Sequence, residues 1–200
     1  MRLFWGIELP AAIVASLCEA QVAIAAACPG ERVSWVAPEA MHITFKFLGD
    51  ATAAAPIVEA VRAALPPTGP LELEVGGLGT FGGRRPRVVW AGVHGPGAEA
   101  LAALAVAVDR ALRPQGFRPE TRRYTPHVTL GRVRPGRKGG RPQSALPAAV
   151  RALTLPAQPL VLTALVLFES SFGQGSGPPV YTPLERVELT TDSPGPPRSR

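Results

Sequence analysis

Two short segments of the chain carry a histidine two residues before a threonine. The first is His42-Ile43-Thr44 and the second is His127-Val128-Thr129, and each lies in an apolar run that is typical of a β-strand. Side chains of a strand alternate between its faces, so the histidine and the threonine share one face while apolar residues point to the other. Two such strands facing each other would place two imidazoles and two hydroxyls around one small ligand.

These residue types suit acid–base chemistry on a phosphodiester. The unperturbed pKa of histidine is about 6.5, so one ring can activate water while the other protonates the leaving oxygen. The threonine hydroxyls can donate to non-bridging phosphate oxygens, and Arg132, which we expect on the same strand face as Thr129, adds a fixed charge with a forked donor. We find no nucleophile in an elbow motif and no Cys/His cluster with metal-ligand spacing, so we expect attack by water and no metal or other cofactor.

The alternative for each motif is a structural role. A single histidine on a strand is more often structural than catalytic, but two motifs in register favour a functional pair. The third histidine, His94, has no threonine partner, and we interpret it as a surface residue.

Composition predicts one compact domain. The chain has 200 residues, of which 46% are hydrophobic and 18% charged. No apolar run is long enough for a membrane span, and the apolar start is too short before Glu8 and Pro10 for a signal peptide. We therefore expect no membrane contact, a cytoplasmic location, free thiols at Cys18 and Cys28, and a monomer.

Positive charge is concentrated in one part of the chain. The net charge is +6, and residues 118–141 contain eight basic residues and one acid, Glu120. This surface favours an anionic substrate such as a phosphate ester or RNA, although the arginine-rich composition also agrees with a GC-rich genome. The Pro/Gly-rich basic loop 134–142 either grips an RNA backbone or is a solvated surface loop.

Strands and helices alternate along the chain. In the first half we predict strands at 3–9, 33–36, 42–49 and 71–75 and helices at 11–27 and 53–65. In the second half we predict strands at 88–93, 127–133, 159–168 and 181–189 and helices from about 97 to 112 and at 145–153. Residues 191–200 lack an apolar anchor and are predicted to be a disordered tail after a single domain at 1–190.

The two halves of the chain repeat each other. Trp5 and Trp90 are separated by 85 positions, as are His42 and His127, and Thr44 and Thr129. This offset indicates a duplicated strand–helix–strand unit and predicts two lobes related by a pseudo-two-fold axis, with equivalent strands meeting across a cleft.

The segments around His42 and His127 resemble the paired signatures of the two-histidine phosphoesterases, and within them the bacterial and archaeal RNA 2′,3′-cyclic phosphodiesterases, also called 2′-5′ RNA ligases. Residues 2–10 and 85–93 are similar to the same family, and the resemblance spans about residues 2–189. It implies a bilobal α+β fold in which two antiparallel sheets form a concave cleft with helices outside. It also implies hydrolysis of a 2′,3′-cyclic phosphate RNA end to a 2′-phosphomonoester.

The resemblance implies a role for each motif residue. His42 would be the proton donor to O3′ and His127 the proton acceptor from water, while Thr44, Thr129 and Arg132 would hold the phosphate.

Aromatic and small residues are also implied. Trp5 and Phe47 match aromatic positions that would sandwich the terminal base, although Trp5 suits a core position in its strand equally well. Gly131 stands where many relatives carry alanine and Phe45 where leucine is common, and we expect neither to touch the chemistry.

Three alternatives remain open. The same cleft could act on small cyclic nucleotides, 2′-5′ oligonucleotides or ADP-ribose cyclic phosphate. The same histidines could run the reverse reaction, which joins a cyclic phosphate end to a 5′-hydroxyl. The basic surface could also bind RNA without any turnover.

Overall fold

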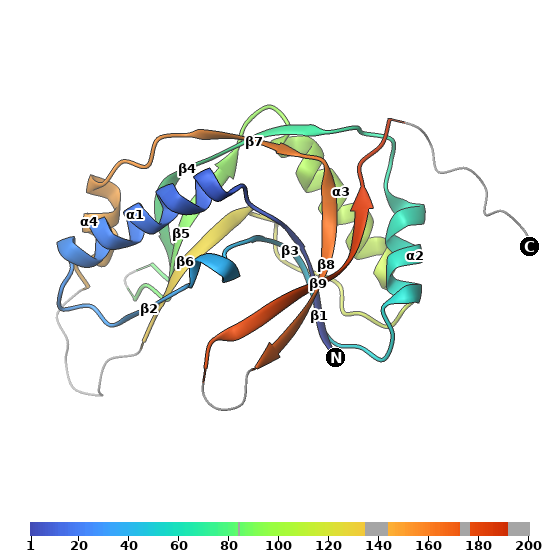
Figure 1. The fold of residues 1–200 in the computed structure, drawn as a ribbon, viewed down its shortest axis with the longest axis horizontal. Helices are drawn as coiled ribbons and strands as arrows, with labels where there is room; N and C mark the ends of the chain where they lie inside the picture. The colour runs from blue at the N-terminus through green and yellow to red at the C-terminus, as the bar shows by residue number, and fades with distance from the viewer. Residues whose placement is uncertain (84, 135–143, 173–176, 192–200) are drawn as a thin grey trace, which may run out of the picture.

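The computed structural model shows a curled antiparallel sheet with helices on its outside (Figure 1). It describes residues 1–83, 85–134, 144–172 and 177–191. The helices are α1 (Ala11–Ala27), η1 (Pro38–Ala40, a 3-10 turn), α2 (Ala55–Ala64), α3 (Ala98–Leu112) and α4 (Leu146–Ala152). The strands are β1 (Arg2–Ile7), β2 (Val33–Trp35), β3 (Ile43–Asp50), β4 (Leu71–Phe81), β5 (Val88–His94), β6 (His127–Val133), β7 (Gln158–Leu162), β8 (Ala164–Phe172) and β9 (Pro179–Glu188).

The strand order confirms the α+β, bilobal fold class and shows where the two lobes are joined. Among the described residues the order is β7-β4-β5-β6-β3-β1-β8-β9. Strand β2 pairs with β6 and is not part of this path. The two predicted sheets are therefore one continuous sheet, because β3 and β6 pair at their inner edges through Ile43 and Val128. These are the central residues of the two His-x-Thr motifs, and both are fully buried.

Each lobe combines strands from both halves of the chain. β4 pairs with β5, and β8 pairs with β1, so each half of the chain supplies a strand to the other lobe. The helices cross over in the same way: α1 lies with α4 against β6, and α3 lies with α2 against β3 (Figure 1). β1 and β3 in one lobe thus correspond to β5 and β6 in the other, at the predicted offset.

Helix α1 shows how the sequence produces this packing. Its buried residues recur at helical spacing and form one apolar stripe: Ile13, Leu17, Ala20 and Ile24. On the same helix, the Gln21 side-chain amide donates to the backbone carbonyls of Val36 and Leu130, at 2.8 and 2.9 Å. α1 is therefore fixed to the strand that carries the second motif.

Two predicted boundaries were wrong. The strand predicted at 159–168 is interrupted at Thr163, and its two parts, β7 and β8, pair with β4 and β1 in different lobes. The strand predicted at 71–75 continues to Phe81, where it pairs with Val88 of β5. A continuous apolar run gives no sign of a corner within it, and the glycines after Val75 obscured the rest of β4.

Some expectations lie largely outside the described residues. Of the basic loop 134–142 the structure describes Arg134, and of the predicted tail it describes Thr191. Within the described ranges, no helix combines the length and the apolar character that a membrane span needs.

A buried ion pair ties the first motif strand to helix α3. The Lys46 ammonium donates to Asp109 Oδ1 at 2.6 Å and to the Arg118 carbonyl at 2.8 Å. Asp109 also accepts from the Glu120 N–H at 2.8 Å and from Arg113 at 2.9 Å. Burial alone would raise the pKa of Asp109, but these hydrogen bonds and the Lys46 charge lower it from 3.8 to about 2. The cluster holds the segment that leads to His127 against β3.

We predict that Asp109→Asn lowers the free energy of unfolding at pH 7 by about 3–5 kcal/mol, because it leaves the buried Lys46 ammonium without a counter-charge. The folded-state pKa of Asp109 lies below its unfolded value, so its contribution is present above pH 3.8 and is lost as the pH falls toward 2. Urea unfolding at several pH values should show the wild type losing about 2 kcal/mol from this group across that window.

The matched control is Glu59→Gln, which removes an exposed ion pair with Arg62 and should cost less than about 1 kcal/mol. Equal effects of the two substitutions would contradict the structural role of Asp109.

Candidate active site

The junction between β3 and β6 brings the two predicted histidines together. His42 immediately precedes Ile43, and His127 immediately precedes Val128, so the two rings flank the residue pair that joins the lobes. Both side chains are half-buried. Burial lowers the pKa of His42 despite its backbone hydrogen bond, and the charges of Arg132 and His127 lower it further. The His127 ring and the Arg132 guanidinium therefore both lie within electrostatic range of His42.

Each imidazole is fixed by the same backbone contact. The Nδ1 of His42 lies 2.8 Å from the Ala40 carbonyl, and the Nδ1 of His127 lies 2.8 Å from the Thr125 carbonyl. Because a carbonyl oxygen can only accept, Nδ1 must carry the proton in both rings. This leaves Nε2 of each ring as the atom that can take up or release a proton.

The two threonines differ in their contacts. Thr44 Oγ1 lies 3.0 Å from His42 Nε2, and the Thr44 carbonyl accepts from the Tyr124 hydroxyl at 3.3 Å. In the part of the chain that the structure describes, Thr129 makes no equivalent contact with His127, although it lines the same cleft as Thr44. The site is thus symmetric in its backbone and asymmetric in its hydroxyl contacts.

Arg132 reaches the cleft because β6 is irregular. It stands three residues after Thr129, and strict alternation would place it on the opposite face. The register between β5 and β6 shifts at this point, pairing Val89 with Gly131 and Trp90 with Thr129. A bulge of this kind adds one extra residue to β6, so the side chains of Thr129 and Arg132 point to the same face of the sheet. The predicted position of Arg132 beside Thr129 therefore depends on the bulge.

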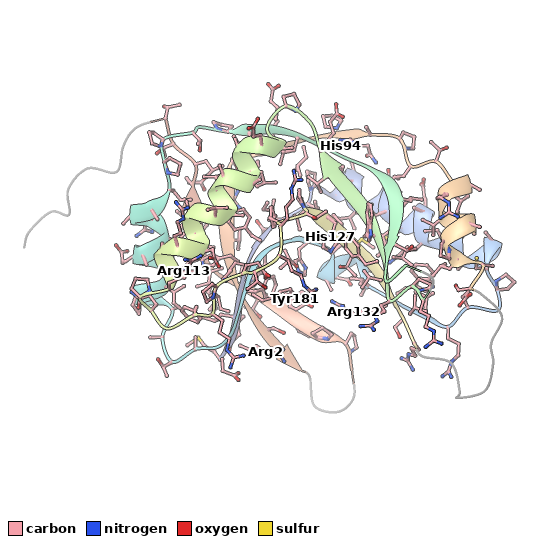
Figure 2. The ribbon with its side chains drawn as sticks, turned by 180° about the vertical axis from the view of Figure 1, so that it is seen from behind. Arg2, His94, Arg113, His127, Arg132 and Tyr181 are labelled. Carbon is pink, nitrogen blue, oxygen red and sulfur yellow. The ribbon has the colours of Figure 1, made fainter. Side chains whose placement is uncertain are left out.

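Most of the predicted site residues line a cleft of about 1110 Å³. His42, Thr44, Thr129 and Arg132 are among its lining residues, and His127 packs edge-on against Phe81 with ring centroids 4.9 Å apart. Figure 2 shows the side chains of His127, Tyr181 and Arg132 near the centre of the molecule, where the lobes meet. The described lining residues include four arginines and no carboxylate: Arg2, Arg32, Arg132 and Arg134. Such a cleft suits an anion.

The structure separates the two aromatic residues that were predicted to stack on a base. Trp5 has no exposed surface and belongs to the core, so the stacking role predicted for it was wrong and its core interpretation was right. The alternation of β1 points Trp5 inward, while its neighbour Phe4 faces the cleft. Phe47 is 67% exposed at the rim of the cleft, with its ring 6.0 Å from Phe4. Stacking by Phe47 stays a prediction.

Sequence reasoning missed Tyr181 and Phe4. The Tyr181 ring stands perpendicular to His42 at 5.0 Å, and the Phe4 ring lies 4.8 Å from it. Burial raises the pKa of Tyr181 while the charges of Arg132 and Arg2 oppose the rise. Tyr181 belongs to β9, which carries no motif. The rarity of tyrosine was the one sequence feature that could have pointed to it. The chain has two tyrosines, and both contact the first motif.

The third histidine lies elsewhere. His94 is exposed at the end of β5, with Nδ1 3.3 Å from Glu74. This confirms the prediction that it is a surface residue.

Comparison with known proteins agrees with this site. A family model described as the 2′-5′ RNA ligase superfamily matches residues 15–171. The chain belongs to the 2′-5′ RNA ligase superfamily. The resemblance seen in the two motifs is thereby confirmed.

Two proteins with curated names are similar to part of the chain. A protein of Geobacillus stearothermophilus named RNA 2′,3′-cyclic phosphodiesterase is 38% identical over 62% of this chain and 40% of its own length. A protein of Methanothermobacter thermautotrophicus with the same name is 41% identical over 52% of this chain and 56% of its own length. The matched part thus spans about half the length of these relatives.

A solved structure extends the similarity to nearly the whole fold. The structure of E. coli LigT complexed with 3′-AMP superposes with a TM-score of 0.69 and 28% identity, covering 94% of this chain and 98% of that one. The similarity in fold therefore includes both lobes and the junction between them.

Proposed function

We propose that this protein is an RNA 2′,3′-cyclic phosphodiesterase, which hydrolyses a cyclic phosphate RNA end to a 2′-phosphomonoester. One observation carries the proposal: two imidazoles, each fixed through Nδ1–H to a backbone carbonyl, stand at the junction of two lobes beside an arginine-lined cleft. The names of the curated relatives support the same activity. E. coli LigT was also solved in complex with phosphate, which agrees with an anion site in this fold.

In the proposed reaction, His127 Nε2 accepts a proton from water as the water oxygen attacks phosphorus. The bond from phosphorus to O3′ breaks, and His42 Nε2–H gives its proton to O3′. Each turnover leaves one ring with a proton gained and the other with a proton lost, and solvent restores both. The hydroxyls of Thr44 and Thr129 and the Arg132 guanidinium hold the non-bridging oxygens as their charge increases.

The lowered pKa of His42 constrains this assignment. A proton donor must be protonated, whereas burial and the charges of Arg132 and His127 favour the neutral ring in the free protein. An anionic phosphate placed beside His42 favours the charged form and raises its pKa again. The donor role of His42 therefore depends on bound substrate.

Further parts of the proposal follow from the site. One chain supplies both imidazoles, which supports a monomer acting on RNA ends, and we place it in the cytoplasm. The reverse joining of a cyclic end to a 5′-hydroxyl would use the same pair, with water dominating in dilute solution.

We predict that His42→Ala and His127→Ala each lower kcat by about 10²–10⁴-fold, because each removes one proton transfer. The assay uses a short RNA with a 2′,3′-cyclic phosphate end in EDTA, with identification of the product end. His94→Ala is the matched control and should retain full activity. Formation of a 3′-phosphate would reverse the choice of leaving oxygen, and full activity of either cleft variant would overturn the proposal.

We predict that an activated substrate separates the two roles. Bis(p-nitrophenyl) phosphate has a leaving group that needs no proton, so His42→Ala should keep most of the wild-type rate on it, while His127→Ala should lose activity on both substrates. Steady-state rates of the two variants on both substrates measure this. Retention by His127→Ala instead would exchange the roles of donor and acceptor.

We predict that Phe47→Ala raises KM for the RNA substrate by about 5- to 150-fold, because base stacking contributes about 1–3 kcal/mol. Phe47→Trp, which keeps an aromatic face, should stay close to the wild type. An unchanged KM in Phe47→Ala would show that the base stacks elsewhere.

A further inference from the structure

The cleft extends beyond the two motifs along β2 and the end of β6. Its described lining continues from Arg132 to Arg32, Ser34, Trp35 and Arg134. The volume of about 1110 Å³ exceeds the range of about 300–1,000 Å³ that is usual for small-molecule pockets. The cleft therefore has room for more than the nucleotide whose phosphate lies at the histidines.

Arg32 and Arg134 are neighbouring arginines in this extension, and a hydrogen bond fixes the Arg134 side chain. The Arg134 N–H donates to the Arg32 carbonyl at 2.8 Å, and Arg134 Nε donates to Ser34 Oγ at 2.6 Å. Among the described residues neither guanidinium has a carboxylate partner, whereas Arg186 is paired with Glu8 and Glu188. The sequence neighbour Glu31 accepts instead from Ser144. The adjacent residues 135–143 contain no aspartate or glutamate.

Strand alternation separates Ser34 from Trp35 in β2. Ser34 is opposite Arg132 in the β2–β6 ladder, and Arg32 and Arg134 lie two residues away from these on the same faces of their chains. Trp35 is opposite Gly131, and its ring packs against the core on the other face of the sheet.

We propose that Arg32, Ser34 and Arg134 form a subsite for the nucleotide on the 5′ side of the terminal cyclic phosphate. The arginines bind the phosphate of that nucleotide, and phosphate contacts of this kind hold a strand without reading its sequence. The inference rests on the proposed function and names its substrate class, which is an RNA strand of two or more nucleotides.

The test compares two substrates, a nucleoside 2′,3′-cyclic phosphate and a tetranucleotide with the same cyclic end. In the double variant Arg32→Ala, Arg134→Ala, we expect kcat/KM for the tetranucleotide to fall about tenfold or more, because the variant lacks two charged hydrogen-bond donors to phosphate. Hydrolysis of the mononucleotide should stay within about twofold of wild type, since that substrate does not reach the subsite. Retained mononucleotide activity also shows that the variant is folded.

The charge-matched control is Arg110→Ala, Arg151→Ala, which removes two exposed arginines on α3 and α4 and should leave both substrates unaffected. Salt dependence gives a second readout. The slope of log kcat/KM against log salt for the tetranucleotide should become shallower by about 0.7 for each phosphate that the variant no longer neutralises, and only in the cleft variant.

Each outcome decides one point. Equal reductions on both substrates, or no reduction on either, would overturn the subsite while leaving the proposed function standing. Failure of the wild type to hydrolyse either substrate would overturn the proposed function and the subsite with it. An equal reduction in the control variant would attribute the effect to net charge and overturn the subsite as well.

Discussion

One antiparallel residue pair, Ile43 with Val128, joins the two lobes and sets the separation of the two imidazoles. One pair is a narrow connection for two halves of a sheet, and two further contacts reinforce it. The Tyr124 hydroxyl donates to the Thr44 carbonyl, and the Lys46–Asp109 cluster holds the segment before β6 against β3. The residues that present the chemistry are therefore adjacent to the residues that hold the lobes together. Helix α1 packs against β6 and helix α3 packs against β3, so each half of the chain covers a motif strand of the other half. A movement of the lobes that opened the cleft would therefore disturb the core.

The electrostatics of the cleft follow from this arrangement. Four arginines and His42 face one cleft whose described lining contains no carboxylate. Positive charge at Arg132 and His127, added to burial, lowers the pKa of His42. An anion placed among these groups reverses the effect, because a nearby negative charge stabilises the imidazolium. The free protein thus disfavours a proton on His42, and a bound anion favours it.

Much of the site could be predicted because it depends on residues that are close together in the sequence. Strand alternation placed His42 with Thr44 and His127 with Thr129, and the common offset of 85 positions predicted the equivalence of β1 with β5 and of β3 with β6. Two features of non-local origin could not be predicted, the junction of the two sheets at Ile43 and Val128 and the break at Thr163. The break sends β7 and β8 to different lobes, and no residue in that apolar run signals it.

Predictions of side-chain roles failed where those roles depend on neighbours that are distant in the sequence. Trp5 shares its strand with Phe4, and only the packing of β1 between β3 and β8 decides which ring faces the cleft. Tyr181 reaches His42 from the other end of the chain. Arg132 was placed correctly, yet its position requires a bulge that alternation alone would not supply.

The most direct test of the account is a nuclear magnetic resonance titration of the imidazoles with a nucleoside 2′-monophosphate. If both rings contact one phosphate, the imidazole resonances of His42 and His127 should both shift in the complex, and the lowered pKa of His42 should rise. The resonances of His94, exposed at the end of β5, should stay in place and serve as an internal reference. A shift at only one of the histidines His42 and His127, or equal shifts at all three, would contradict a shared phosphate site at the junction of the lobes.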